Sequence, residues 1–295
     1  MATVPVLGAE HADVLARARI LFTDVDGTLV GPGGTLLADA DGRPSTRTAE
    51  AVVAVNRAAL PVVITTGRNR MQTAEISRLV GWRAFIAELG CVVQFDRSEE
   101  PALLAGDWPS DALMPGETPW QAIVRAGALD ALSEAFPGRI EEHAPWHVDR
   151  YATHVLRGNV DAHEAQRLLD ELPLPIDIVD NGVIRPPRHT LVGVEEIHAY
   201  HLVPRGASKT RAIRLVLDRF GLEPEHALAV GDSASDVEMA DAVALLVLVA
   251  NALDDERVRK AVSGRDNVAV TRGRRGDGWA ELASAWLEAR SGRTT

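Results

Sequence analysis

Two carboxylates two residues apart are the first feature of this sequence that could do chemistry. Asp24 ends the predicted strand of residues 19–24, and Asp26 follows in a turn that contains Gly27. The turn can bend the chain so that both carboxylates reach one pocket. Neighbouring carboxylates repel, and a bound cation or a proton on one of them relieves the repulsion. Taken alone, such a pair is more often two solvated aspartates, so its interpretation depends on the residues around it.

A hydroxyl group and a glycine end the next β-branched stretch, residues 61–68 (PVVITTGR). Thr66 and Gly67 stand where a hydroxyl and backbone N–H groups can hold phosphate oxygens. The alternative for Thr66 is the N-cap of a helix that begins near Arg70. The sequence leaves both interpretations open.

Lys209 is informative because lysine is rare in this chain. Of the 31 basic residues, only Lys209 and Lys260 are lysines. Lys209 lies in the first turn of a predicted helix, a position that the helix dipole disfavours for a cation. An anion-binding role is therefore favoured over a solvated surface charge. The surrounding residues lack the glycine spacing of a Walker A loop.

A second pair of acids follows a later apolar run. In LAVGDSASD, Asp232 comes at a predicted strand end and Asp236 lies one helical turn further on the same face. An N-capping aspartate would explain one of these acids and not both. Carboxylate oxygens with few nitrogen or sulfur ligands nearby suit Mg²⁺.

Alternating strands and helices must position these residues. Helices are predicted at residues 44–60, with Ser45 or Thr46 as N-cap, at about 70–80, and at 208–221, with Gly221 as C-cap. Between them lie short apolar strands, which predicts a doubly wound α/β fold with a mainly parallel, Rossmann-like sheet. Ligands of such folds bind beyond the carboxyl ends of the strands, where Asp24, Thr66 and Asp232 are all predicted.

The middle of the chain differs in composition. Residues 108–200 are richer in Pro, Trp and His and contain amphipathic, edge-like strands around one clear helix. We expect an inserted α+β domain at 108–200, between two parts of a core at 1–107 and 201–295. Polar residues of its strands are the candidates for substrate contact: His147, Arg150, Tyr151, His154, Arg188 and His189. The spacings of His143 with His147 and of His198 with His201 could suggest zinc, which the absence of cysteine near them disfavours.

Composition limits the classes of function. A formal net charge of −11 argues against binding to nucleic acid or to an anionic membrane. No apolar run is long enough to span a membrane, and no signal segment stands at the start, so a cytoplasmic location is expected. The single cysteine, Cys91, lies in an apolar run and is interpreted as structural. Residues 1–17 carry no functional interpretation.

In order and spacing, the motifs DVDGT, TTGR, an isolated helix-opening lysine and GDSxSD resemble the haloacid dehalogenase (HAD) phosphohydrolase superfamily. The long insert, with FIAELGCVV and VANA, is similar to the Cof-type branch with a C2 cap, which includes phosphatases of sucrose phosphate and mannosyl-phosphoglycerate. The motifs span the core, whereas the resemblance of the insert is only architectural.

The resemblance implies a role for each motif residue. Asp24 would attack phosphorus to form an aspartyl phosphate, and Asp26 would protonate the leaving oxygen and then activate water. Thr66, Gly67 and Lys209 would hold the phosphoryl oxygens. Mg²⁺ would be bound by Asp24, Asp26 through its backbone carbonyl, and Asp232, with Asp236 a further ligand or an anchor for the others. Hydrogen bonds that support these ligands are expected from Ser233, Ser235 and Asn251.

Two positions depart from the family pattern. Ser235 and Leu89 both stand where the family commonly has asparagine. Serine can still donate a hydrogen bond there, whereas leucine cannot. Neither change removes an expected charged catalytic group.

The function predicted from the sequence is Mg²⁺-dependent hydrolysis of a small phosphorylated metabolite, with a sugar phosphate as the favoured class, by a monomer or homodimer. A phosphomutase or phosphotransferase would share every core residue, and analysis of the products would separate it from a hydrolase. A non-catalytic protein that binds a phosphometabolite is the alternative from another class. Such a protein would bind without turnover and would not need Asp26.

Overall fold

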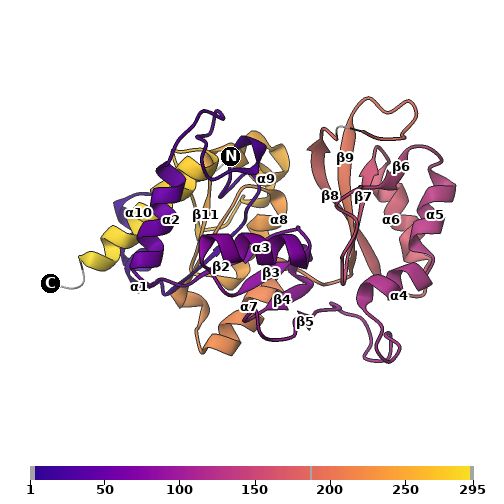
Figure 1. Cartoon of the computed structure of the whole chain (residues 1–295), viewed down its shortest axis with the longest axis horizontal. Coiled ribbons are helices and arrows are strands. Elements are labelled where there is room, and N and C mark those ends of the chain that lie inside the picture. The colour runs from indigo at the N-terminus through magenta and orange to yellow at the C-terminus, as the bar shows by residue number, and fades with distance from the viewer. Residues whose placement is uncertain (1–3, 187, 293–295) are drawn as a thin grey trace.

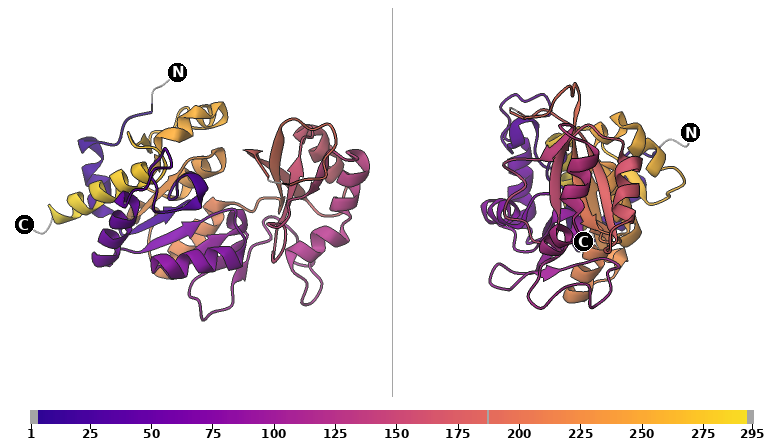
Figure 2. Two further views of the ribbon diagram at one scale, coloured as in Figure 1. Left: turned by 45° about the horizontal axis from the view of Figure 1, so that its top comes forward. Right: turned by 90° about the vertical axis from the view of Figure 1, so that its right-hand side faces the viewer.

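The computed structural model describes residues 4–186 and 188–292. It shows a larger α/β core beside a smaller body that carries its own sheet, which we call the cap (Figure 1). The last helix, α10, runs along the core away from the cap, so the C-terminal end lies at the opposite end of the molecule (Figure 2).

The core is built on an eight-stranded sheet with the order β12-β11-β10-β1-β2-β3-β4-β5. Neighbouring strands from β12 to β3 are parallel, while β4 and β5 are added antiparallel at the β3 edge. The strands are β1 (Ile20–Thr23), β2 (Val62–Thr65), β3 (Phe85–Ala87), β4 (Val92–Gln94), β5 (Ala102–Leu103), β10 (Ala227–Gly231), β11 (Leu245–Leu248) and β12 (Val268–Val270).

Helices cover both faces of this sheet. One apolar cluster joins alternate strand residues such as Leu21 to α1 (Ala12–Arg17), α2 (Arg47–Arg57), α3 (Arg70–Val80) and α10 (Arg275–Ser291). A second cluster joins the intervening residues such as Phe22 to α7 (Lys209–Phe220), α8 (Ala234–Val237) and α9 (Glu256–Ala261). Because both faces are buried, the strands are almost entirely apolar, and the polar exceptions Thr23, Thr65 and Gln94 lie at strand ends. The predicted doubly wound α/β fold is confirmed.

The cap contains a four-stranded antiparallel sheet with the order β6-β7-β9-β8. Its strands are β6 (Ile140–Glu142), β7 (His154–Gly158), β8 (Ile176–Ile184) and β9 (Ile197–Pro204), and its helices are α4 (Pro119–Arg125), α5 (Ala128–Ala135) and α6 (Ala162–Asp170). The helices pack on one face in a separate apolar cluster. The other face is turned toward the core. An α+β cap inserted between the two parts of the core is therefore confirmed, while its limits at 108 and 200 stay a proposal.

Short 3₁₀ helices complete the described structure: η1 (Ala9–His11), η2 (Pro32–Gly34), η3 (Glu88–Gly90), η4 (Pro224–His226), η5 (Glu238–Ala242) and η6 (Ala250–Asp254). None of the helices in residues 4–186 and 188–292 has the length and apolar character needed to cross a membrane.

The helix ends decide between the caps that the sequence left open, and the predicted N-cap Thr46 of α2 is confirmed. The N-cap of α3 is Asn69, whose side chain accepts from the N–H of Gln72 at 2.8 Å, so Thr66 is not the cap. At α2, Thr46 is the N-cap residue, but its hydroxyl donates to Glu50 at 2.7 Å instead of accepting from the backbone. The predicted C-cap of α7 is confirmed, because Gly221 adopts a left-handed φ of 63°.

Candidate active site

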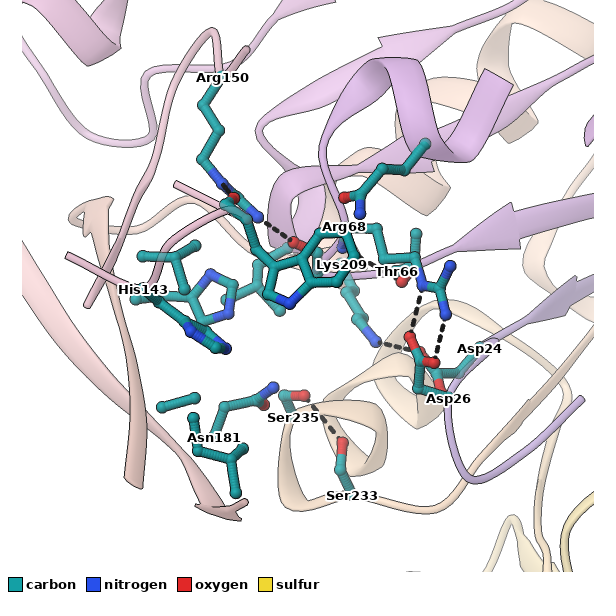
Figure 3. Close-up of a pocket in the computed structure, with 18 of the residues that line it drawn as sticks. Asp24, Asp26, Thr66, Arg68, His143, Arg150, Asn181, Lys209, Ser233 and Ser235 are labelled. Carbon is teal, nitrogen blue, oxygen red and sulfur yellow. Dashed lines mark hydrogen bonds and ion pairs between the residues drawn. The ribbon is translucent and has the colours of Figure 1, made fainter. Parts of the chain in front are cut away.

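The ends of three parallel strands and the start of one helix meet at a single cavity. Asp24 directly follows β1, Thr66 follows β2 and Asp232 follows β10, and these strands are parallel neighbours. Lys209 is the first residue of α7. All four line a cavity of about 540 Å³ between the core and the cap (Figure 3). Residues far apart in the sequence are thus brought together because parallel strands end at the same edge of the sheet.

Lys209 is the only described cation within bonding distance of Asp24. Its Nζ lies 3.2 Å from Oδ1 of Asp24 and 2.6 Å from Oδ1 of Asp236. Burial alone would lower the pKa of Lys209, but the carboxylates of Asp236 and Asp24 outweigh burial and raise it. Lys209 is therefore a buried, fully charged ammonium that joins two carboxylates.

Asp236 has both of its oxygens engaged by protein donors. Oδ1 accepts from Lys209, and Oδ2 accepts from the N–H of Asp232 at 3.1 Å, the N–H of Ser233 at 2.9 Å and the hydroxyl of Ser233 at 2.7 Å. Of the two roles that the sequence left open for Asp236, this geometry favours an anchor for Lys209 and for the loop after β10.

Three carboxylates form a cluster with uncompensated charge. Ligand oxygens of Asp24, Asp232 and Asp236 all lie within 4.8 Å of one another. Burial raises the pKa of Asp24 well above its usual value, and the neighbouring aspartates add to this against the pull of Lys209. Burial and Asp236 raise the pKa of Asp232 to about 7. Such a cluster could hold a metal ion, and its oxygen ligands suit Mg²⁺.

The position of Asp232 is fixed by its neighbours. Its oxygens accept from the hydroxyl of Thr28 at 3.2 Å and from the amide of Asn251 at 3.0 Å. Asn251 also donates to the carbonyl of Gly27 at 3.0 Å. Gly27 has a φ of +82°, and a Cβ there would lie 2.2 Å from Oδ2 of Asp232, so only glycine fits. The predicted supporting residue Asn251 thus lies against a predicted metal ligand.

The side chain of Asp26 is held by an arginine that the sequence analysis did not single out. Nε of Arg68 lies 2.7 Å from Oδ2 of Asp26, and Nη2 lies 2.6 Å from Oδ1 (Figure 3). The N–H of Arg68 also donates to the hydroxyl of Thr66 at 3.2 Å. Arg68 is the last residue of the TTGR motif, but nothing in that motif indicates the partner of its side chain. This bidentate ion pair holds the Asp26 carboxylate at the mouth of the cavity.

The two departures from the family pattern lie in the cavity wall. Ser235 shares a hydrogen bond of 2.9 Å with Ser233, and Leu89 is buried. A methyl of Leu89 lies 3.3 Å from the place where a Cβ on Gly67 would be. The side chain of Leu89 thus packs against the loop after β2 without a hydrogen bond, while the N–H of Leu89 donates to the carbonyl of Thr66 at 3.1 Å.

Of the six cap candidates named from the sequence, only Arg150 lines the cavity. Tyr151 packs under the guanidinium of Arg70 at 5.8 Å, and His154 stacks on Trp120 at 4.7 Å. Nε2 of His147 lies 3.6 Å from a carboxylate oxygen of Glu142. Arg188, like His189, is exposed and does not line the cavity.

Other residues of the cap face the core instead: His143, Trp146, Val155, Asn181, Ile184, Ala199 and His201. His143 and His201 were considered in the sequence only as parts of zinc pairs. In the described residues, the group of three or more side chains placed to hold one metal ion consists of Asp24, Asp232 and Asp236 and contains no histidine.

The β6–β7 loop of the cap, residues 143–153, docks on the core. Nη2 of Arg150 donates to the carbonyl of Gly67 at 3.0 Å, and the amide of Asn69 donates to the carbonyl of Val148 at 3.0 Å. The loop is thereby attached to the segment that contains Thr66.

Glu88 anchors the same loop from the core. Its side chain is fully buried, and its oxygens accept from the N–H groups of Tyr151, Ala152 and Thr153 at 3.0, 3.1 and 2.9 Å. The guanidinium of Arg150 lies 4.0 Å away. Glu88 itself adopts a left-handed φ of 52°. A buried anion is thus matched to three N–H groups and a cation across the boundary between core and cap.

Replacing Glu88 with glutamine should release this loop. The amide keeps the size of the side chain, but its NH₂ cannot accept from an N–H, and Arg150 loses its buried counter-charge. We expect the free energy of unfolding to fall by about 3 kcal/mol and kcat/KM for a substrate that contacts the cap to fall, as measured by urea denaturation and steady-state kinetics. Glu75→Gln, on the exposed surface of α3, is the control. Equal effects of the two variants would refute the anchoring role.

Two family models match the parts of the chain that form this cavity. The family model described as haloacid dehalogenase-like hydrolase matches residues 21–111, which contain Asp24, Asp26 and Thr66. The model described as sucrose-6F-phosphate phosphohydrolase matches residues 195–286, which contain Lys209, Asp232 and Asp236. The two matches cover the two parts of the core that meet at the cavity. The chain is a haloacid dehalogenase-like hydrolase. Its residues 195–286 are similar to the sucrose-6F-phosphate phosphohydrolases.

Curated relatives of this hydrolase include two phosphoglycolate phosphatases. That of Methanoculleus marisnigri is 26% identical over 79% of this chain and 85% of its own length. That of Methanothrix thermoacetophila is 27% identical over 78% of this chain and 82% of its own length. This hydrolase is thus a HAD-type phosphatase, a phosphoric monoester hydrolase.

Solved structures share the fold across core and cap. The sucrose-phosphatase of Synechocystis, solved with sucrose and phosphate, aligns with a TM-score of 0.61 at 16% identity, covering 92% of this chain and 98% of that one. The Thermoplasma acidophilum protein 0175 aligns with a TM-score of 0.59 at 17% identity, with the same coverage. At these identities the likeness shows the fold alone.

Proposed function

We propose that this phosphatase hydrolyses a small phosphorylated metabolite with Mg²⁺, through a phosphoryl group carried on Asp24. The observation that carries the proposal is the convergence in one cavity of two acids after β1, a buried charged lysine and a cluster of carboxylates with uncompensated charge. Phosphoryl transfer needs little more than a positioned nucleophile and neutralisation of the phosphoryl charge.

Asp24 is the proposed nucleophile. One of its oxygens would attack phosphorus while the bond from phosphorus to the leaving oxygen breaks, which leaves an aspartyl phosphate. Lys209, 3.2 Å from Asp24, and the hydroxyl of Thr66 would hold the equatorial oxygens. In the second step water would attack phosphorus, and inorganic phosphate and the Asp24 carboxylate would be released. Covalent catalysis in this way replaces one difficult displacement by two easier ones.

Asp26 is the proposed general acid and base. It would donate a proton to the leaving oxygen in the first step and take one from water in the second. The two hydrogen bonds from Arg68 hold its carboxylate at the cavity mouth. Asp26 must therefore exchange at least one of these bonds for the leaving oxygen as the reaction proceeds.

Asp24, the backbone carbonyl of Asp26, and Asp232 are the proposed ligands of Mg²⁺. When bound, the ion supplies positive charge that offsets the acidic cluster and the phosphoryl oxygens. Asp236, whose oxygens are already engaged, would position Lys209 and the loop of Ser233. The cytoplasmic location and the monomeric or homodimeric state stay predictions from the sequence.

The expected substrate class is a sugar phosphate. The cavity of about 540 Å³ extends from the phosphate site to the inner face of the cap and offers room for a leaving group of several carbons. Phosphoglycolate, after which the curated relatives are named, is the second candidate. It is favoured by the relatives and would fill little of this volume.

Phosphate release from a panel of metabolites tests the proposal. Purified protein with Mg²⁺ should release inorganic phosphate from some phosphomonoesters, and chelation of Mg²⁺ should stop it. Asp24→Asn is the matched control because it keeps the shape of the site and removes the nucleophile. Transfer of the phosphoryl group to a second hydroxyl would identify a mutase or phosphotransferase instead. Tight binding of a phosphometabolite without turnover would show a binding protein.

A further inference from the structure

Two histidines of the cap form part of the wall of the cavity. His201 lies on β9 and lines the cavity. His143 directly follows β6 and also lines it, as does Asn181 (Figure 3). The ring of His201 comes within 3.3 Å of the place where a Cβ on Gly67 would be. His201 therefore lies beside the loop that is proposed to hold phosphate.

The ring nitrogens Nδ1 of both histidines lack a hydrogen-bond partner in the protein. Nδ1 of His201 and Nδ1 of His143 are buried and have no hydrogen-bond partner. His201 is 4% exposed, and its side chain lines the cavity. A buried polar atom without a partner costs free energy in the free protein, and a ligand that pairs with it recovers that cost.

Both imidazoles are neutral at physiological pH. Burial lowers the pKa of His143 to about 4, helped by the charges of Arg157 and Arg150. Burial lowers the pKa of His201 well below its ordinary value, and Arg150 adds to this effect. A neutral imidazole has one N–H donor and one acceptor nitrogen. It therefore matches a hydroxyl group, which can also donate and accept.

The cations that line the cavity in the described residues are already paired. Lys209 bonds Asp24 and Asp236, and Arg68 bonds Asp26. Arg150 donates to the carbonyls of Trp146 and Gly67 and to the hydroxyl of Thr153, near the carboxylate of Glu88. A second negative group on a substrate would find no free positive charge among them, and burying a carboxylate without one is costly.

We propose that His143 and His201 bind hydroxyl groups of the leaving group, so that the site selects phosphomonoesters of uncharged polyols or sugars over those of hydroxy acids. This inference rests on the proposed function, because it assigns the leaving-group side of the same cavity. It places specificity in two cap residues, separate from the motif residues of the core.

Phenylalanine variants test these roles because the ring keeps its bulk and loses both hydrogen-bonding nitrogens. His201→Phe and His143→Phe should each lower kcat/KM for the best sugar or polyol phosphate about 10- to 100-fold. With p-nitrophenyl phosphate, whose leaving group has no hydroxyls to bind, kcat/KM should change less than about twofold. His201→Asn should recover part of the loss, since an amide also donates and accepts.

His154→Phe is the matched control. It removes another buried cap histidine, which stacks on Trp120 and does not line the cavity. Its selectivity between the two substrates should equal that of the wild type. Thermal unfolding of every variant separates loss of fold from loss of selectivity.

A binding experiment distinguishes failure of this inference from failure of the proposed function. Hexose and pentose phosphates and 2-phosphoglycolate are titrated calorimetrically into Asp24→Asn protein with Mg²⁺. A sugar phosphate that binds more tightly than 2-phosphoglycolate, and that His201→Phe weakens, supports the inference even if the wild type hydrolyses nothing. Tighter binding of 2-phosphoglycolate, or equal losses on both substrates in the phenylalanine variants, would overturn it while leaving phosphatase activity intact.

Discussion

Asp24→Asn is expected to abolish phosphate release and, at the same time, to stabilise the metal-free protein. Loss of the nucleophile should lower kcat at least about 10⁴-fold, the scale seen when a residue that forms a covalent intermediate is removed. The side chain is buried among three other aspartates, and its pKa is raised well above the usual value. A neutral amide removes that repulsion, so the free energy of unfolding should rise by about 1 to 2 kcal/mol.

The pH dependence of stability shows whether the charge on Asp24 stabilises or destabilises the metal-free protein. Asp24 and Asp232 bind protons more tightly in the folded protein than in the unfolded chain, since their pKa values are raised from 3.8, that of Asp232 to about 7. The metal-free wild type should therefore lose stability as pH rises from about 4 to about 7. Asp24→Asn should show a shallower loss over the same range.

Thermal unfolding across pH, with chelator and with Mg²⁺, measures both effects. A saturating ion at 100 times its dissociation constant would add about 2.7 kcal/mol to the wild type at pH 8, and the variant should respond less. Asp13→Asn, an exposed acid at the start of α1, is the control for charge alone. An inactive Asp24→Asn protein that is also less stable than wild type would show Asp24 to be structural.

The core site could be predicted from the sequence because local patterns determine it. Asp24, Thr66 and Asp232 each end an apolar strand, and parallel strands bring such ends to one edge of a sheet whatever their separation in the chain. Lys209 was marked by the scarcity of lysine. Arg68 was missed because no local pattern shows that a side chain after β2 will pair with one after β1.

The cap could be predicted only as an architecture. Successive side chains on a strand point to opposite faces of the sheet. An error of one residue in the predicted alternation therefore assigns a cavity-facing side chain to the face that the helices cover. On β7, Val155 lines the cavity while its neighbour His154 packs on Trp120. On β9, His201 faces the cavity while Tyr200 packs among the helices. The sequence shows the alternation but not which face the helices cover.

The role of Glu88 could not be predicted from the sequence for a different reason. A buried carboxylate in a left-handed conformation is disfavoured locally, and its partners lie more than 60 residues away in the cap. Its position makes sense only once the N–H groups of Tyr151 to Thr153 and the guanidinium of Arg150 surround it. Such a contact follows from the docking of two bodies, which local propensity does not encode.

Lys209→Met should have the second large effect, and it should act on stability and activity in the same direction. The ammonium lies between Asp24 and Asp236, which are 7% and 0% exposed. Removing one partner of a buried ion pair leaves uncompensated charge, which costs about 3 to 5 kcal/mol. Loss of the cation that faces the phosphoryl oxygens should also lower kcat by about 10²- to 10³-fold.

Urea denaturation and kinetics with Lys260→Met provide a matched control, because Lys260 is the other lysine and its side chain is 74% exposed beside Glu256. That variant should behave as wild type. Adding Asp236→Asn to Lys209→Met should restore much of the stability, since one of the unpaired charges is gone, and none of the activity, since the phosphoryl group still lacks its cation. If the double variant recovers activity as well, Lys209 acts only by neutralising Asp236 and does not bind phosphate. Recovery of neither property would mean that the lysine packs the start of α7 and that its charge is incidental.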